Sequence, residues 1–363
     1  MNTLQKETSL TPLRFQQLLL NWFDYSGRKD LPWQQDKTPY RVWVSEIMLQ
    51  QTQVNTVITY FNRFIKHFPT LEKLAAANED AVLHLWTGLG YYNRARNLQK
   101  TAKIIVQHYH GQFPNQLSEL EKLPGIGRST AGAILSIAFN QPATILDGNV
   151  KRVLTRLHGI TEWPGIKETT EQLWSIAEQY TPMQRTADYT QAIMDLGATL
   201  CIRGKPRCLE CPYQLDCSAH AQGIEKTLPL SKPRKTLPIR QVTLLILHKR
   251  SHLVLLEKRA PAGIWASLWS LPEVNGIPSA AEIRKICKQR FQLQVEQSVL
   301  GQSFRHTFSH FHLDIVPALV TVKTTNTKIM EHTQQIWYNL QHPQAVGLPA
   351  PVKSLLIHLE KTL

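Results

Sequence analysis

Four of the five cysteines of this chain, Cys201, Cys208, Cys211 and Cys217, lie close together, with six, two and five residues between them. Thiolates so near in sequence can surround one metal centre, and sulfur ligands select iron–sulfur clusters or zinc. A structural zinc ion is the simpler alternative, although paired C-x2-C units are more typical of zinc than this irregular spacing. The sequence therefore predicts a loop wrapped around a metal centre, whose role we expect to be structural.

Cysteine usage also indicates the cellular compartment. Cysteines crowded into one loop do not resemble the disulfide framework of a secreted protein, and the fifth, Cys287, is expected to be a buried, inert thiol. The N-terminal "MNTLQKETSL" has no apolar segment of the kind found in signal peptides, and no stretch approaches a membrane-spanning helix. We expect a cytoplasmic protein that does not contact a membrane.

The hydrophobic pattern changes once along the chain, which at 363 residues is long enough for two domains. Between residues 11 and 200, segments such as "TPLRFQQLLLNWFDY" repeat apolar residues at helical spacing, here after a threonine cap and a proline. Later segments such as "QVTLLILHK" and "FHLDIVPALVTVK" are typical of strands. We predict a helical domain over 1–225, an extended basic linker over 226–240 and an α+β domain over 241–363.

The charge of the chain favours an anionic partner. Forty-one basic residues against 27 acidic ones leave a formal net charge of +14. A surplus of this size suits a polyanion such as nucleic acid, although a basic housekeeping enzyme with no such partner is an equal alternative on charge alone.

A glycine turn, "LPGIGRSTAG", offers a place for a phosphate. Gly125 and Gly127 can take a positive φ and let backbone N–H groups approach an oxygen closely, and a helix beginning near Arg128 adds its N-terminal dipole. An ordinary loop is the common explanation of a lone GxG. The flanking helices, the net charge and Asp147, twenty residues beyond Gly127, favour the phosphate site.

Together these motifs resemble a known family. "LPGIG", the downstream aspartate and the C-x6-C-x2-C-x5-C loop are similar to the endonuclease III superfamily of DNA glycosylases, and "LPWQQDKTPYRVWVSEIMLQQTQV" narrows the resemblance to adenine DNA glycosylases of the MutY type. It extends from about residue 12 to the C-terminus. The resemblance implies an all-α helix–hairpin–helix domain with one [4Fe–4S] cluster, held by the four cysteines, and then an α+β Nudix-like domain. It also implies a monomer that removes adenine opposite 8-oxoguanine or G from double-stranded DNA.

Breaking the N-glycosidic bond of adenine requires two carboxyl groups in different environments. Glu46 lies in the apolar run "VWVSEIMLQQ", where burial would keep it protonated, and a continuous helix would place Gln50 and Gln53 on its side. The resemblance implies that Glu46 protonates adenine at N7, that an ionised Asp147 stabilises the cationic sugar, and that Asn149 helps hold the site. Taken singly, a surface glutamate and a plain helix N-cap are the simpler interpretations of Glu46 and Asp147.

Two alternatives to this activity remain. In bifunctional relatives a lysine stands where this chain has Ser129, and its amine attacks the sugar and leads to strand cleavage. Ser129 has no amine, so the resemblance implies base removal without strand cleavage, although Lys151 lies near Asp147 in sequence. A non-catalytic damage-binding protein is the other alternative, and the presence of both carboxyl groups argues against it.

The resemblance assigns further contacts residue by residue. Trp33, Leu49, Gln191 and Ser129 match the adenine pocket, while Gly125, Gly127, Arg128 and Lys151 match the DNA-binding surface. Gln51 and Tyr91 match positions that are inserted into the duplex at the lesion, so that the adenine can leave the base stack. An aromatic residue such as Tyr91 is more often part of a core than a wedge.

The C-terminal half carries a separate signal. It lacks the glutamate cluster that a Nudix hydrolase needs for magnesium, so we do not expect nucleotide hydrolysis. Phe308, Ser309 and His310, in "FRHTFSHFHLDI", match the stretch that reads 8-oxoguanine in the family, with Ser309 as the best hydrogen-bonding candidate. A strand with histidines on its solvent face is the simpler alternative.

Overall fold

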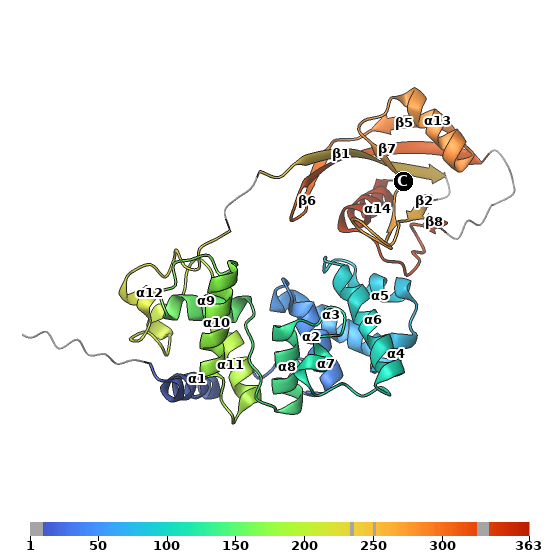
Figure 1. The fold of residues 1–363 in the computed structure, drawn as a ribbon. Coiled ribbons are helices and arrows are strands. Elements are labelled where there is room, and N and C mark those ends of the chain that lie inside the picture. Colours follow the sequence, from blue (N-terminus) through green and yellow to red (C-terminus); the bar gives the residue numbers. More distant parts are fainter. Residues whose placement is uncertain (1–9, 233–235, 250–251, 325–333, 363) are drawn as a thin grey trace, which may run out of the picture. The chain divides into compact units, whose positions relative to one another are not determined.

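The computed structural model describes residues 10–232, 236–249, 252–324 and 334–362 (Figure 1). The chain divides into two compact units. The helical unit consists of Met1–Ala76 and Asn97–Pro233, and the sheet unit consists of Ala77–Arg96 and Arg234–Leu363. None of the described helices combines the length and the apolar character that crossing a membrane would need.

The helical unit is built almost entirely from α-helices, as the periodicity predicts. Its helices are α1 (Pro12–Ser26), α2 (Pro39–Leu49), α3 (Val54–His67), α4 (Leu71–Ala76), α6 (Asn93–His108, whose first residues belong to the sheet unit), α7 (Leu117–Leu120), α8 (Arg128–Phe139), α9 (Gly148–Leu157), α10 (Lys167–Tyr180), α11 (Thr186–Thr199), the 3-10 turn η1 (Cys208–Glu210) and α12 (Ser218–Ala221). The predicted start of α1 is confirmed: the Thr11 side chain accepts from the backbone N–H of Arg14, and Pro12 is the first helical residue. Thr38 and Pro39 begin α2 in the same way.

The core of this unit ties α1 to the cysteine loop. Phe15 has no exposed surface and lies stacked between Tyr180 and Tyr213, with ring centroids 4.1 and 4.7 Å away. Tyr213 lies within the cysteine loop and donates a hydrogen bond to the Phe15 carbonyl oxygen at 2.8 Å. Because Leu19 and Phe23 follow Phe15 at intervals of four, one face of α1 packs into this core.

The helix that carries Glu46 is shorter than the sequence indicates. α2 ends at Leu49, Gln50 leaves the helical conformation, and Gln51 takes a left-handed φ of 58°. The expectation that Gln50 and Gln53 share one helix with Glu46 is therefore wrong. The Gln50 side chain instead donates to the hydroxyl of Thr130 on α8, at 3.3 Å, so a tertiary contact outweighs its helical propensity.

Two glycines let α8 and α11 approach the segment around Asp147. A Cβ on Gly132 of α8 would lie 2.3 Å from the Thr144 carbonyl oxygen, and one on Gly197 of α11 would lie 2.6 Å from the Asn149 Cβ. Neither space can be made by moving a flexible side chain, because backbone atoms stand beside both glycines. Larger residues at these positions would push the helices away from Asp147.

The sheet unit is a mixed sheet with helices. Its elements are α5 (Glu79–Trp86), β1 (Ile239–Lys249), β2 (Leu253–Lys258), β3 (Trp269–Ser270), β4 (Glu273–Asn275), α13 (Ala280–Phe291), β5 (Leu293–Leu300), β6 (Phe304–Thr307), β7 (His312–Thr324), β8 (Gln335–Asn339) and α14 (Ala350–Thr362). The central order is β3-β2-β1-β7-β5, with β4 on β1, β6 on β7 and β8 on β2. β1 and β7 are parallel, with Ile239 opposite His312, and the other pairs are antiparallel.

Both faces of the sheet are covered. β1 is buried at seven successive positions, 242–248, which an alternating half-exposed strand would not allow. Figure 1 shows α13 and α14 on opposite sides of the sheet. Cys287 of α13 is fully buried against Leu245 and Val320, which confirms the expected buried thiol.

Two observations bear on the predicted linker, 226–240. Leu228 is buried, and its carbonyl oxygen accepts from the Arg156 guanidinium at 2.9 Å, so this part of the segment is held by the helical unit. Ile239 and Arg240 already belong to β1. The ordered chain thus reaches into both ends of the segment, and the domain boundaries themselves stay predictions.

Candidate active site

Glu46 lies on α2 between fully buried neighbours, with Ser45 and Ile47 on either side. Its side chain is surrounded by protein but keeps part of its surface accessible. Burial, and to a smaller extent the nearby negative charge of Asp147, raise the pKa of Glu46 to about 8. Within the described part of the chain, no hydrogen bond to the Glu46 carboxyl group opposes this effect, so the group holds a proton at neutral pH.

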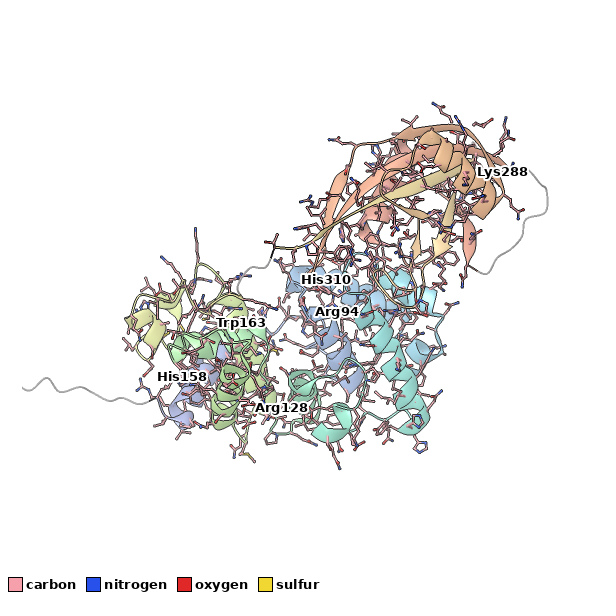
Figure 2. The ribbon with its side chains drawn as sticks, turned by 45° about the horizontal axis from the view of Figure 1, so that its top comes forward. Arg94, Arg128, His158, Trp163, Lys288 and His310 are labelled. Atoms are coloured by element: carbon pink, nitrogen blue, oxygen red, sulfur yellow. The ribbon has the colours of Figure 1, made fainter. Side chains whose placement is uncertain are left out.

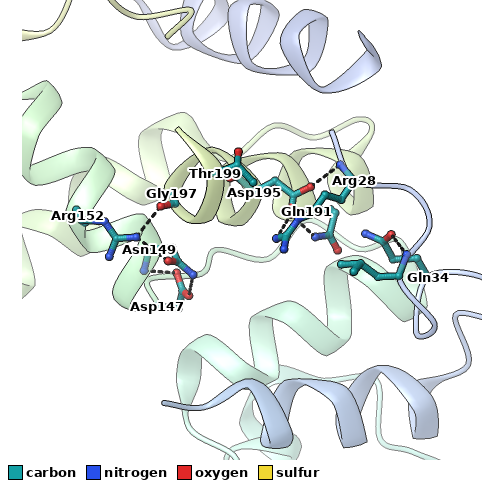
Figure 3. Close-up of polar contacts among 10 residues, drawn as sticks. Arg28, Gln34, Asp147, Asn149, Arg152, Gln191, Asp195, Gly197 and Thr199 are labelled. Atoms are coloured by element: carbon teal, nitrogen blue, oxygen red, sulfur yellow. Dashed lines mark hydrogen bonds and ion pairs between the residues drawn. The ribbon is translucent and has the colours of Figure 1, made fainter. Parts of the chain in front are cut away.

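Asp147 caps α9, as its position in the sequence predicts. Its Oδ1 accepts from the backbone N–H groups of Asn149 and Val150, at 3.1 and 2.8 Å, and its Oδ2 accepts from the Asn149 side chain at 3.0 Å (Figure 3). Burial raises the pKa of Asp147 above its ordinary value, and these hydrogen bonds and the charge of Arg152 offset only part of that rise. Since the same contacts are lacking at Glu46, the negative charge of the pair is better stabilised on Asp147.

A side-chain network centred on Arg152 lies behind Asp147, and the sequence did not predict it. Arg152 donates to Asn149 Oδ1 at 2.8 Å and to the Gly197 carbonyl oxygen at 2.6 Å (Figure 3). It also donates to the Cys201 carbonyl oxygen at 2.7 Å. The arginine thus fixes Asn149 from the side away from Asp147 and joins α9 to α11 and to the first cysteine. The one feature of the sequence that could have indicated this role is that Arg152 follows the N-cap of α9 by about one helical turn.

Ser129 has a structural contact beside the carboxyl groups. Its Oγ accepts a hydrogen bond from the backbone N–H of Leu146, the residue before Asp147, at 3.0 Å. The start of α8 therefore helps to place the Asp147 segment. The hydroxyl oxygen is occupied by this contact, and no amine stands in its place.

The two carboxyl groups can carry out complementary steps. A protonated carboxyl group can donate a proton to a leaving group, and a hydrogen-bonded carboxylate can stabilise a positive charge that develops nearby. Placing them in different environments is what divides these roles.

Comparison with known proteins decides the family. The model of the HhH-GPD superfamily of base excision DNA repair proteins matches residues 44–196, and that of the NUDIX domain matches residues 242–358. The adenine DNA glycosylase of Buchnera aphidicola subsp. Acyrthosiphon pisum is 43% identical to this chain, over 98% of this chain and 100% of that protein. This chain belongs to the adenine DNA glycosylase family. Another adenine DNA glycosylase, from Buchnera aphidicola subsp. Baizongia pistaciae, is 41% identical over 97% of this chain and 98% of that protein.

A solved structure supports the glycosylase fold of the helical part. The structure of a thermostable thymine-DNA glycosylase superimposes with a TM-score of 0.53 at 26% identity, covering 58% of this chain and 97% of that chain. The predicted fold class, a helix–hairpin–helix glycosylase domain followed by a Nudix-like domain, is confirmed.

The four cysteines of this family member surround one place in the helical unit. Each is half-buried and free of disulfides, and three of them, Cys201, Cys211 and Cys217, pack against the helical core. Burial raises the pKa of Cys211 to about 12, with the other three sulfur atoms adding to the effect. Thiols in such a place are protonated unless a metal draws them into the thiolate form.

The described cysteine sulfur atoms are spaced more widely than the ligands of a single zinc ion. Four thiolates around one zinc ion lie about 3.8 Å apart, as follows from tetrahedral bonds of about 2.3 Å. Among the described residues, the one set of three potential ligands within 4.8 Å of one another is Cys208, His220 and Glu225, which includes only one of the four cysteines. In addition, the buried Arg156 donates to Cys201 Sγ at 3.3 Å, and such a hydrogen bond favours a charged sulfur ligand.

The glycine turn agrees only in part with the expectation. Gly125 has a φ of 80°, whereas Gly127 is extended, with φ −95° and ψ 173°, so the expectation of a left-handed Gly127 is wrong. A Cβ on Gly127 would meet nothing within 4 Å. Neither the backbone conformation nor internal packing therefore requires glycine at this position.

Arg128 and Lys151 stand at the starts of α8 and α9. The Arg128 guanidinium (labelled in Figure 2) lies over the Trp174 ring, 4.0 Å from its centroid, and also contacts Glu178. Its charge is therefore partly engaged within the protein. Lys151 is half-buried, and no ion pair to it is found among the described residues.

The two residues expected to enter the duplex share an unusual backbone. Gln51, in the helical unit, and Tyr91, in the sheet unit, are exposed and have positive φ values of 58° and 47°. Tyr91 keeps 54% of its surface, so it is not a core residue. Exposed non-glycine residues in this conformation are uncommon, and they gather at functional sites.

The expected adenine-pocket residues differ in exposure. Trp33 is 5% exposed and packs edge-on against Phe61, with centroids 5.5 Å apart, whereas Leu49 and Gln191 are half-buried. Gln191 donates from Nε2 to Oδ1 of the fully buried Asp195 at 2.9 Å (Figure 3). Asp195 was not found from the sequence, although its place one turn after Gln191 on α11 is a usable signal.

Phe308, Ser309 and His310 form the tip of the hairpin between β6 and β7. The backbone N–H of Phe308 donates to the Phe311 carbonyl oxygen at 2.9 Å, and the two rings stack 4.7 Å apart. Ser309 and His310 are exposed, and Ser309 Oγ lies 3.4 Å from His310 Nδ1. Of the two residues, Figure 2 labels His310. The hairpin thus presents these two polar side chains from a rigid aromatic base.

Proposed function

We propose that this protein hydrolyses the N-glycosidic bond of adenine opposite 8-oxoguanine or G in double-stranded DNA, and leaves an abasic site. As a member of its family it is a DNA N-glycosylase, a hydrolase of base excision repair. The observation that carries the finer proposal is the pair of unequal carboxyl groups, Glu46 with a pKa raised to about 8 and the hydrogen-bonded Asp147.

The proposed reaction assigns one step to each carboxyl group. Glu46 donates its proton to N7 of adenine, so that the base leaves as a neutral molecule when the bond between C1′ and N9 breaks. Asp147 stabilises the positive charge that develops on the sugar, and Asn149 holds Asp147 in place. Water then adds to C1′ and loses a proton, which completes the hydrolysis.

The same geometry supports base removal without strand cleavage. A bifunctional enzyme attacks the sugar with an amine. At the matching position Ser129 offers a hydroxyl oxygen that already accepts the Leu146 N–H. Lys151 follows Asp147 closely on α9 and remains the candidate for slow trapping of the abasic aldehyde.

The cysteine loop supports one [4Fe–4S] cluster as the bound cofactor. Cys201, Cys208, Cys211 and Cys217 would hold it, and Arg156 donates towards the first of them. When bound, the cluster supplies structural cohesion to the loop. No step of the proposed hydrolysis passes through it.

DNA recognition is assigned to three groups of residues. Gly125, Gly127 and Arg128, with Lys151, would contact the DNA backbone, and the net charge of +14 supports such binding. Gln51 and Tyr91 would fill the space that the extruded adenine leaves, while Trp33, Leu49, Gln191 and Ser129 would form its pocket. Phe308, Ser309 and His310 would recognise the opposite 8-oxoguanine. We place the enzyme as a monomer in the cytoplasm, at the nucleoid if the cell is bacterial.

One assay tests the proposal. A duplex with adenine opposite 8-oxoguanine is incubated with the protein and examined with and without alkali. Strand cleavage only after alkali is the expected result, because alkali breaks the chain at an abasic site. Cleavage without alkali would show a lyase, and an intact strand under both conditions would show a protein that only binds.

A further inference from the structure

The Gln191 side chain is hydrogen-bonded to Asp195, a buried carboxylate that forms an ion pair with Arg28, a residue far away in the sequence. Asp195, on α11, has no exposed surface, and its Oδ2 accepts from the backbone N–H of Arg28 at 2.8 Å. Its Oδ1 accepts from Arg28 Nε at 3.0 Å and from Gln191 Nε2 at 2.9 Å (Figure 3). Every hydrogen bond to this carboxylate therefore has an N–H donor.

The carboxylate fixes which end of the Gln191 amide faces outwards. A carboxylate can only accept hydrogen bonds, so it binds the NH2 group of a carboxamide and repels the carbonyl oxygen. The Arg28 guanidinium holds Asp195 in place, with only 25% of the arginine side chain exposed. Gln191 must then present Oε1 away from Asp195, and within the described residues this oxygen accepts no hydrogen bond.

An outward carbonyl oxygen has a definite preference among purines. It accepts a hydrogen bond from the amino group at C6 of adenine, whereas it faces the oxygen at C6 of hypoxanthine or guanine without a proton between them. We propose that Arg28 and Asp195 are positioning residues, which lock the Gln191 amide in this orientation and so make the site select a 6-aminopurine over a 6-oxopurine. This inference rests on the proposed function, because it assumes that Gln191 faces the extruded base.

The test compares single-turnover rates of release for adenine and for hypoxanthine, placed opposite the same partner base. The wild-type protein should favour adenine. In Asp195→Asn the negative charge that attracts the Gln191 NH2 group and the Arg28 guanidinium is lost, so the Gln191 amide is held less firmly, and the adenine-to-hypoxanthine rate ratio should fall about tenfold. Asp188→Asn is the matched control, because Asp188 lies on the same helix, is partly exposed and pairs with Arg185. Its ratio should not change.

A double-mutant cycle separates positioning from general damage. In Gln191→Leu no amide remains to be oriented, so adding Asp195→Asn should cause no further change in the rate ratio. If the Asp195→Asn protein does not melt cooperatively, Arg28→Gln provides a second variant, with a smaller loss of preference expected because the backbone N–H of residue 28 still holds Asp195.

The outcomes are distinguishable. A wild-type protein that releases no adenine would remove the proposed function itself. A wild-type protein that releases adenine, together with an Asp195→Asn ratio equal to that of the wild type, would overturn only the positioning role. An equal fall of the ratio with and without Gln191 would also overturn it, because the effect would then not pass through the amide.

Discussion

The charge of Asp147 raises the pKa of Glu46, although the two residues lie on different helices about 100 positions apart in the sequence. Burial affects both carboxyl groups, but Asp147 accepts three hydrogen bonds that stabilise its anion. The shared electrostatic environment therefore favours one proton on Glu46 and one negative charge on Asp147. This is the arrangement that protonation of a leaving base and stabilisation of a cationic sugar require.

Base release should depend on pH through Glu46. The acid must be protonated to act, so the single-turnover rate should fall as the pH rises through about 8, the raised pKa of this group. The measurement is the rate of adenine release between pH 6 and 9.5, with DNA binding followed in parallel. A rate that increases across this interval would mean that Glu46 acts as a base or not at all.

Glu46→Gln should abolish base release while DNA binding persists. We expect a loss of at least about 100-fold, the lower range for removal of a general acid. Glutamine is close in size and neutral, so the fold should not suffer. Glu171→Gln, an exposed glutamate on α10, is the control and should keep full activity. Substantial turnover by Glu46→Gln would remove Glu46 as the acid.

The same variant should be more stable than the wild type in alkaline solution. The pKa of Glu46 is about 8 in the folded chain, against an ordinary value of 4.5. The wild-type protein therefore loses no stability through this group below about pH 4.5. The loss grows as the pH rises and reaches its full size above about pH 8. Above about pH 8 the Glu46→Gln protein should gain up to about 5 kcal/mol in unfolding free energy, at about 1.4 kcal/mol for each unit by which the pKa is raised. Denaturant unfolding at pH 5 and pH 9 checks the sign, since the gain should grow with pH.

Comparing Asp147→Asn with Asp147→Ala should distinguish the effect of the Asp147 charge on base release from its effect as the N-cap of α9. Asparagine is also a good N-cap, so Asp147→Asn should keep the stability of α9 but lose base release by about 100-fold or more, because the sugar cation lacks its counter-charge. Asp147→Ala should lose the same activity and also about 1 kcal/mol of stability. Equal activity of the asparagine variant and the wild type would show that Asp147 only caps the helix.

Ser309→Ala should lower the preference for adenine opposite 8-oxoguanine over adenine opposite G. A single good contact to a base edge contributes about 1–3 kcal/mol of discrimination, so the preference should fall about fivefold or more. The rate with adenine opposite G should change little, because the contact that is removed is proposed to be made to 8-oxoguanine and not to G. Ser303→Ala, another exposed serine beside β6, serves as the control. An unchanged preference in Ser309→Ala would count against the assignment of this hairpin.

The purified protein should contain iron in an amount that corresponds to one [4Fe–4S] cluster, with a broad absorption shoulder in the visible range. Cys211→Ser should lose this iron and become less stable, because the loop that carries Tyr213 is tied to the α1 core. Cys287→Ser, which changes the buried thiol of α13, should keep the iron. One zinc ion per protein and no absorption in the visible range would show that the loop holds a single zinc ion and not a cluster.

Local signals were sufficient where the chain interacts with its own neighbours in sequence. Thr11 with Pro12 predicted the start of α1, and Asp147 before "GNVKRV" predicted the cap of α9. Both signals depend on hydrogen bonds within one helical turn. They failed at Gln50, whose side chain bonds to Thr130 on another helix, and at Gly127, whose extended backbone follows from how the turn enters α8.

Periodicity, spacing and residue type are properties of the chain itself, so the two kinds of architecture, the clustering of four cysteines and the residues that match the family could all be predicted from the sequence. The influence of the Asp147 charge on Glu46, the contacts of Arg152 with Asn149 and the cysteine loop, and the hydrogen bond from Gln191 to Asp195 became visible only in the folded chain. They could not be predicted because pKa values and hydrogen-bond partners depend on which segments pack together. Gly132 and Gly197 permit that packing, and nothing in the sequence indicates which backbone atoms lie against them.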